Sequence, residues 1–435
     1  MGVHRYDAPL AETVERLRNG DLTVDDYLAD LRERVDAVEP EVQAFVDAPE
    51  WDRLESEAAT LVERAADGED LPLYGSTVGV KDIIHVDGLP TRANSGIPPE
   101  ALAGPEASCV TRLREAGCLV LGKTVTTEFA ATTQKTGPTR NPHNLAHTPG
   151  GSSSGSAAAV AAGLCPLALG TQTGGSTLRP AAFCGIVGFK STFQRIPTDS
   201  VIEVSGSLDH VGVYTQDVAG MERAAAVMCD DWDDTVEASD SPTLGVPTGP
   251  YLDQVRAEAD EAFETHREAL DAAGYEIREV DLFEDIEAAT DRHRTLMVTE
   301  AALAHHERFE AHSDGYCEDV SETIAEGRAE TVETLARVRE YQKEFTADIE
   351  ATMDAEGVDL WVCPPALGTA PEGIESTGDA SMNMPWTLAG MPAVSLPGGT
   401  VEGLPVGLQV VASTGEDERL LDWAEDIAPV VADTV

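Results

Sequence analysis

The sequence has few lysines and, over one long run, no charged residues at all. Its 435 residues include 79 Asp and Glu against 29 Lys and Arg, a formal net charge of −50. Only five of the basic residues are lysines, and four of those lie between positions 81 and 190. From residue 141 to residue 178 there is no Asp, Glu, Lys or Arg. Because ionised side chains are almost never fully buried without a partner, we expect this run to lie inside the molecule.

Further absences exclude several classes of protein. The seven cysteines never form a CxxC pair, and the ten histidines show neither HExxH nor HxH spacing, so we expect no disulfide framework and no metal site. No apolar run is long enough to cross a membrane, and the first ten residues lack the apolar segment of a signal peptide. A strongly acidic surface repels nucleic acid and anionic lipid. We therefore expect a cytoplasmic protein with no cofactor that binds neither nucleic acid nor membrane.

Two glycine-rich stretches lie at the uncharged run: Gly150–Ser156 reads GGSSSGS and Gly170–Arg179 reads GTQTGGSTLR. Glycine lets the backbone approach a ligand closely, and successive N–H groups in such turns can hold an anion. Ser176 would have its hydroxyl beside donors suited to a developing oxyanion. The same residues also fit two ordinary turns around a short Ala-rich helix, expected at Ser156–Gly163.

Lys81 is the lysine best suited to chemistry. It stands in TVGVKDIIHV, whose β-branched residues predict a strand that enters the interior. A buried lysine loses its proton readily and can act as a general base, which arginine cannot. Two serines and such a lysine would form a hydrolytic site without histidine.

With these residues the sequence resembles the amidase signature family, in the family's order and over about three quarters of the chain. The matching stretches are Gly79–Asp82, Gly88–Gly96, Gly122–Ala130, Pro149–Lys190, Pro385–Gly399 and Gly403–Val411. The resemblance implies a catalytic triad, with Ser176 as nucleophile, Ser152 as the bridging serine on a cis peptide, and Lys81 as base. It also implies that the oxyanion is held by the backbone N–H groups just before the nucleophile, those of Thr173, Gly174 and Gly175.

The resemblance also suggests substrate contacts, at Ser153, Thr171 and Arg179. In the malonamidase-like branch, which shares GTQTGGSxxRP, the arginine that matches Arg179 holds a carboxylate of the substrate. A local role for Arg179, in which it caps carbonyls or pairs with a buried acid, fits the sequence equally well. Many members carry Asp where this chain has Gln172, so a charged contact cannot be assumed there.

The implied activity is hydrolysis of a small carboxylic amide to acid and ammonia or amine, through a serine acyl-enzyme. Two alternatives stay open: the amidase subunit of a tRNA-dependent amidotransferase, and a catalytically silent scaffold of the family. Gln172 favours a stand-alone hydrolase close to the malonamidases, because the amidotransferase subunit usually has Asp at that position. The sequence leaves a homodimer open, and any dimer interface should be a less charged patch.

One rival motif is present. Gly151–Gly155 matches GxSxG, the nucleophile elbow of α/β-hydrolases, with Ser153 as nucleophile. That elbow follows directly after a strand, whereas NPHNLAHTPG before it is a turn-rich coil. The elbow interpretation is therefore disfavoured.

The expected fold is α/β. From residue 74 on, strand and helix patterns alternate, which predicts a sheet covered on both faces by helices. The resemblance implies the amidase signature fold, with a central twisted mixed sheet. We expect one domain over residues 1–435, made of N-terminal helices (1–70), a core with the catalytic residues (74–220), and a helical cap with the remaining strands (221–435).

Several elements are specific enough to test. PLALGT at 166–171 should be a central strand that ends at the glycine turn. A helix should begin after Thr23 and end before Glu39 and Pro40. Three acidic segments with few Gly or Pro should be long helices, at 257–273, 286–311 and 321–355.

The charge distribution leads to a prediction about salt. Residues 76–200 carry 10 basic and 7 acidic residues, so the rest of the chain carries a net −53. Such a shell is typical of proteins from a high-salt cytoplasm, where screening weakens self-repulsion. The melting temperature should therefore rise by at least several degrees between dilute buffer and molar KCl. A melting temperature indifferent to KCl would separate the acidic composition from any adaptation to salt.

Overall fold

Strands and helices alternate along most of the chain. The computed structural model describes residues 7–134, 136–236, 238, 240–283, 285–432 and 434–435. The strands are β1 (Thr77–Lys81), β2 (Leu119–Thr124), β3 (Leu167–Gln172), β4 (Val187–Lys190), β5 (His210–Thr215), β6 (Leu244–Thr248), β7 (Ile277–Asp281), β8 (Leu360–Cys363), β9 (Ala393–Val401) and β10 (Leu404–Val411). The helices are α1 (Leu10–Asn19), α2 (Val24–Val42), α3 (Trp51–Ala66), α4 (Ser108–Glu115), α5 (Ser154–Ala161), α6 (Leu178–Cys184), α7 (Val218–Met228), α8 (Ala257–Ala273), α9 (Ile286–Ala304), α10 (His306–His312), α11 (Glu318–Ala329), α12 (Val332–Glu356), α13 (Met384–Leu388) and α14 (Asp417–Val431).

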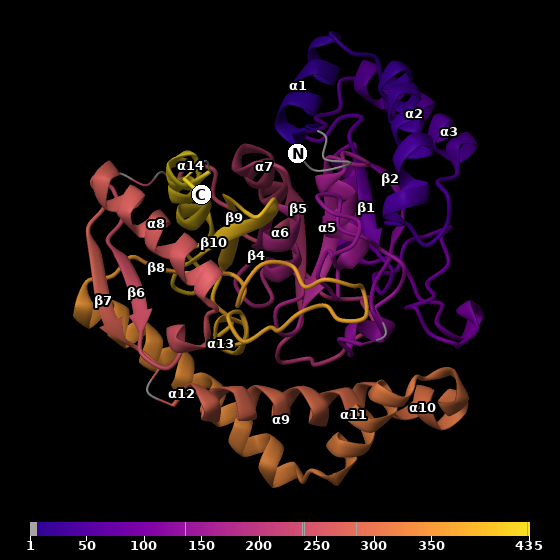
Figure 1. Cartoon of the computed structure of the whole chain (residues 1–435). Coiled ribbons are helices and arrows are strands. Elements are labelled where there is room, and N and C mark those ends of the chain that lie inside the picture. Colours follow the sequence, from indigo (N-terminus) through magenta and orange to yellow (C-terminus); the bar gives the residue numbers. More distant parts are fainter. Residues whose placement is uncertain (1–6, 135, 237, 239, 284, 433) are drawn as a thin grey trace.

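Within the described residues, ten strands form one mixed sheet in the order β2-β1-β3-β5-β4-β9-β10-β8-β6-β7. β1 pairs in parallel with β2 and β3, and β6 pairs in parallel with β7 and β8. The strands from β3 through β5, β4, β9 and β10 to β8 pair antiparallel. Helices lie on both sides of the sheet (Figure 1). The predicted fold class is confirmed.

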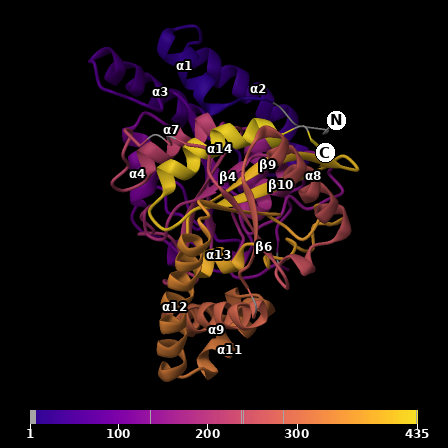
Figure 2. The same ribbon diagram turned by 90° about the vertical axis from the view of Figure 1, so that its left-hand side faces the viewer.

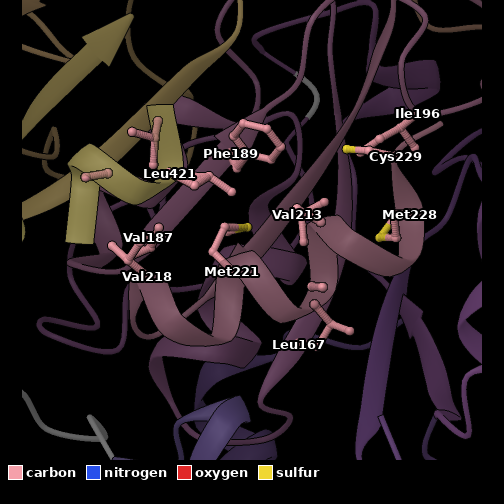
Figure 3. Close-up of a cluster of buried hydrophobic side chains, with 14 of the residues drawn as sticks. Leu167, Val187, Phe189, Ile196, Val213, Val218, Met221, Met228, Cys229 and Leu421 are labelled. Atoms are coloured by element: carbon pink, nitrogen blue, oxygen red, sulfur yellow. The ribbon is translucent and has the colours of Figure 1, made fainter. Parts of the chain in front are cut away.

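Both faces of the sheet are buried, which explains why its strands are apolar without strict alternation. In β3, Leu167 and Leu169 point into the core to which α7 contributes Met221, part of which is shown in Figure 3. Ala168, between them, points into the second core, with Ala158 of α5. β3 is an interior strand, third from the β2 edge of the sheet.

Small residues let α5 lie close against the sheet. Each of its eight residues is buried. Gly155 leaves no room for a side chain, because a Cβ there would lie 2.2 Å from the carbonyl oxygen of Ala44. The N–H of Gly155 donates to Val125 O, and Ser156 Oγ donates to Leu169 O. The first turn of α5 is therefore fixed against β3 and the residue that follows β2.

α2 is longer than predicted. It continues through Pro40 to Val42, so the expectation that it ends before Glu39 was wrong. Proline lacks an N–H, so α2 continues past Pro40 without one of its helical hydrogen bonds. The Glu39 carboxylate accepts hydrogen bonds from the N–H groups of residues 44 and 45, which holds the chain that leaves the helix.

The helices α9 to α12 form a separate layer below the sheet (Figures 1 and 2). The predicted helix at 257–273 is α8, whereas the segments 286–311 and 321–355 are each divided. The first breaks at His305, and in the second Thr331 caps the start of α12 by accepting from the N–H of Thr334. No helix in the described ranges is both long and apolar enough to cross a membrane.

β6 and β7 extend the sheet beyond β8 and were not predicted. β6 contains Pro247, and β7 reads IREVD, so neither has the apolar or alternating pattern of a strand. Pairing with β8 and with each other makes them strands, which is a tertiary effect.

Candidate active site

Lys81 lies in the interior with its amine against two hydroxyl groups. It is the last residue of β1, and its side chain is fully buried. Its Nζ lies 2.7 Å from Ser152 Oγ and 2.7 Å from Thr171 Oγ1. β1 and β3 are parallel neighbours, so they end at the same edge of the sheet, where the turn before α5 meets them.

A pocket of about 450 Å³ lies next to this contact. Its lining includes Ser152, Ser176, Gly174 and Gly175, so the two serines of the predicted triad face one cavity. Ser176 is half-buried, in the turn between β3 and α6. The peptide bond that precedes Ser152 is cis, as the resemblance implied. Residues of α9 and α11 complete the lining, so the helical layer closes one side of the pocket.

The turn of residues 173–176, here called the nest, is held by its carbonyl groups. Thr173 O accepts from His293 Nε2 at 2.8 Å, and Gly174 O accepts from Thr387 Oγ1 at 2.6 Å. No acceptor in the described chain takes a hydrogen bond from the N–H of Gly174 or Gly175. The nest therefore offers free donors beside Ser176.

Gln172 directly precedes the nest, and its side chain bonds the backbone that directly follows the nest. Its Oε1 accepts from the N–H groups of Thr177 and Leu178, at 2.8 and 3.0 Å. Its Nε2 donates to Thr387 Oγ1 at 2.9 Å. The neutral amide of Gln172 both accepts and donates, so it holds the backbone around the nest without a charge.

Asp209 is a half-buried acid that bonds the nest and acts electrostatically on Lys81. Its carboxylate accepts from Thr173 Oγ1 at 2.5 Å and from the N–H groups of residues 204 and 205. Burial holds the pKa of Lys81 well below the ordinary lysine value, and the negative charge of Asp209 acts in the opposite direction. Burial also raises the pKa of Asp209 to about 6, so the group is largely ionised at neutral pH.

Arg179 lies behind the nest and is almost fully buried. Its Nε donates to Thr377 O at 2.9 Å and its Nη2 to Gly151 O at 2.6 Å. Its Nη1 has no hydrogen-bond partner in the described chain, and a Cβ on Gly175 would lie 3.1 Å from it. Because Arg179 also lines the pocket, it both caps carbonyls locally and keeps a nitrogen unpaired next to the nest.

Two of the expected substrate contacts are engaged elsewhere. Ser153 is fully buried, and its Oγ bonds the backbone N–H and carbonyl of Thr171. Thr171 in turn lies against the amine of Lys81. Neither is in the lining of the pocket that contains Ser176, because the first turn of α5 directs Ser153 into the sheet. Both residues support Lys81 and β3.

Nothing in the sequence indicates His293, Thr387 or Asp209 as parts of the site. Each reaches the nest from an element remote in the chain, namely α9, α13 and the loop before β5. His293 lies in an acidic helix without any ligand or catalytic spacing, and a lone histidine of this kind is more often structural. Only the tertiary contacts distinguish these residues from their neighbours.

The model of the amidase family matches residues 26–421 of the chain. The chain belongs to the amidase family. The resemblance to the amidase signature enzymes is thereby confirmed, and solved amidase structures have the same fold.

The similar proteins divide into two groups. The A-type subunit of the glutamyl-tRNA(Gln) amidotransferase from Synechococcus sp. (strain RCC307) is 31% identical over 483 positions, covering 98% of this chain and 98% of that protein. A solved structure described as an amidase has a TM-score of 0.87 at 31% identity, covering 96% of this chain and 99% of the other. The peptide amidase of Stenotrophomonas maltophilia has a TM-score of 0.83 at 26% identity, covering 98% and 97%. In all three cases the similarity extends over nearly the whole length of both chains.

Burial and the charge of Asp209 shift the pKa of Lys81 in opposite directions, which gives a testable prediction. Replacing Asp209 with Asn removes the negative charge that favours the ammonium form, so the pKa of Lys81 should fall further. The ¹³Cε shift of Lys81 reports this titration, and with five lysines in the chain the signals can be assigned by substitution. Asp319→Asn is the matched control, because that carboxylate also lines the pocket but binds Thr132 rather than the nest. A rise in the pKa of Lys81 in Asp209→Asn would contradict the assignment.

Proposed function

We propose that the chain hydrolyses a carboxylic amide through an acyl-enzyme on Ser176. The observation that carries the proposal is the 2.7 Å contact between Lys81 Nζ and Ser152 Oγ, at a pocket that also contains Ser176. Burial lowers the pKa of Lys81 and so favours the neutral amine, which can accept a proton, whereas an exposed lysine at its ordinary pKa of ~10.4 is protonated at neutral pH.

The proton moves along the two serines. Neutral Lys81 takes the proton of Ser152 Oγ, and Ser152 takes that of Ser176 Oγ as the latter attacks the amide carbon. The C–N bond breaks, and the relay in reverse returns a proton to the departing nitrogen, which leaves as ammonia or an amine. Water then attacks the ester in the same way, and the acid is released with Ser176 restored.

The nest stabilises the oxygen that becomes charged. The N–H groups of Gly174 and Gly175 are unengaged, and with the N–H of Thr173 they are the donors assigned to the oxyanion. Each such donor supplies on the order of 3–4 kcal/mol in the transition state when it is aimed at the developing charge.

The position of Arg179 favours a substrate amide that also bears a carboxylate group. Arg179 lines the pocket, and its unpaired Nη1 is buried beside the nest. A guanidinium binds a carboxylate more strongly than a neutral group, above all where water is excluded. This assignment corresponds to the malonamidase-like substrate class.

The final acceptor of the nitrogen distinguishes two candidate functions. As a stand-alone amidase the chain releases ammonia or an amine to solution, which the solved amidase structures support. As one subunit of an amidotransferase it passes ammonia to a partner, and the curated relatives support this second candidate better. The alignment with the Synechococcus protein is longer than the 435 residues of this chain, so part of that protein has no counterpart here.

Assays of the purified chain distinguish the two candidate functions. A stand-alone amidase should release ammonia or amine from a panel of small amides, including malonamate and glutamine, at a rate that further subunits do not change. A member of an amidotransferase complex should be nearly inactive alone and should gain activity on glutamine when the other subunits and the charged tRNA are added. The panel is measured at low and high KCl because of the acidic surface.

The nucleophile is tested by labelling. A fluorophosphonate should form its adduct on Ser176, and Ser176→Ala should lose both the adduct and at least ~1,000-fold in kcat while the circular dichroism spectrum is unchanged. Peptide mass spectrometry locates the adduct. An adduct on Ser153 would support the nucleophile-elbow interpretation instead.

Arg179 is tested by a pair of substrates of similar size. Arg179→Ala should raise KM for malonamate ~10-fold or more, because a charge-assisted contact is lost, and should leave KM for a neutral amide such as butyramide almost unchanged. Thr377→Ala is the control, because it removes a hydroxyl that Arg179 Nη2 contacts without removing the cation. Equal losses on both substrates would assign Arg179 a purely structural role.

A further inference from the structure

Two side chains donate hydrogen bonds to carbonyl groups of the nest. His293, from α9 in the helical layer, donates from Nε2 to Thr173 O at 2.8 Å, and its ring is buried. Thr387, from α13, donates from Oγ1 to Gly174 O at 2.6 Å and is also buried. Both bonds therefore end on carbonyl groups of consecutive peptide units.

Fixing a carbonyl also fixes the N–H of the same peptide unit. A trans peptide is planar, and its C=O and N–H point in opposite directions. The bond at Thr173 O thus sets the direction of the Gly174 N–H, and the bond at Gly174 O sets that of the Gly175 N–H. Glycine has no Cβ to restrict such a peptide plane, so without these bonds the plane could turn.

The hydrogen-bond partners of His293 and Thr387 determine which proton each side chain donates. A carbonyl oxygen only accepts, so His293 must carry its proton on Nε2. Burial lowers the pKa of His293 to about 4, so the ring is neutral over the physiological range. Thr387 Oγ1 accepts from Gln172 Nε2 at 2.9 Å, which leaves its single proton for Gly174 O or, less closely, for Asn383 O at 3.0 Å.

We infer that His293 and Thr387 are positioning residues that aim the two glycine N–H groups of the nest at the substrate oxyanion. The inference rests on the proposed function, since it requires an oxyanion beside Ser176. It also makes the seating of α9 a condition for catalysis, because the helical layer supplies one of the two hydrogen bonds. Neither side chain takes part in proton transfer.

The threonine is tested with a pair of substitutions. Thr387→Val keeps the shape and removes the donor, so kcat should fall ~10- to 100-fold, less than the loss of an oxyanion donor itself, with KM within about threefold. Thr387→Ser retains the hydroxyl and should recover most of kcat. The matched control is Thr346→Val, which also removes a hydroxyl that bonds two carbonyls, those of Gln342 and Ala389, away from the nest.

The histidine is tested in the same way. His293→Leu should lower kcat by a similar factor, and His293→Gln, whose side-chain amide can place a donor near Nε2, should restore part of it. His305→Gln is the control, since that buried histidine at the end of α9 bonds Glu203 O rather than the nest. These variants keep the inference testable should Thr387→Val fail to fold, which circular dichroism would show.

An inhibitor that forms a tetrahedral adduct with the serine distinguishes a lost orientation of the N–H groups from a general disturbance of the site. In Thr387→Val and His293→Leu, the affinity for the trifluoromethyl ketone that corresponds to the best amide of the panel should fall in parallel with kcat/KM, while the affinity for the acid formed from that amide stays unchanged. Wild-type kcat in both variants, or a lower kcat with unchanged ketone affinity, would overturn the inference. Failure of the proposed function looks different, because the wild-type chain would then be inactive on every amide tested or Ser176→Ala would retain the activity.

Discussion

The burial of one amine is the constraint on which the rest of the site depends. Lys81 has no carboxylate in contact with its Nζ within the described chain, and its nearest groups are the hydroxyls of Ser152 and Thr171. Keeping an ammonium ion there would cost several kcal/mol of lost hydration, so the neutral form is favoured. The basicity that an amidase needs thus follows from the packing around the end of β1.

That packing requires small residues. β1, β3 and the turn before α5 meet only because α5 presents Gly, Ser and Ala to the sheet, and Gly155 has a backbone oxygen where a side chain would be. A larger residue in the first turn of α5 would move Ser152 away from Lys81. The run without charges and the placement of the relay are therefore consequences of the same close approach.

The orientation of the nest depends on hydrogen bonds from distant parts of the chain. Its backbone is local, but its orientation is fixed by Asp209 before β5, His293 in α9 and Thr387 in α13. These contacts join the sheet, the helical layer and the C-terminal segment around one turn. The pocket beside Ser176 exists only when all three are assembled, which couples the stability of the helical layer to the geometry of the site.

The α/β class, most elements near the site and the candidates Lys81 and Ser176 could be predicted from residue patterns, because spacing and composition are local properties of the chain. Ser152 was implied by the resemblance to the amidase signature family. The residue patterns also predicted β3 and the small-residue helix after the first glycine stretch. Three features could not be predicted and depend on tertiary contacts: the strands β6 and β7, the inward direction of Ser153, and the hydrogen bonds from His293 and Thr387 to the nest. Strand pairing, side-chain direction and hydrogen bonds across more than a hundred residues have no local signature, since each depends on which elements the assembled core brings together.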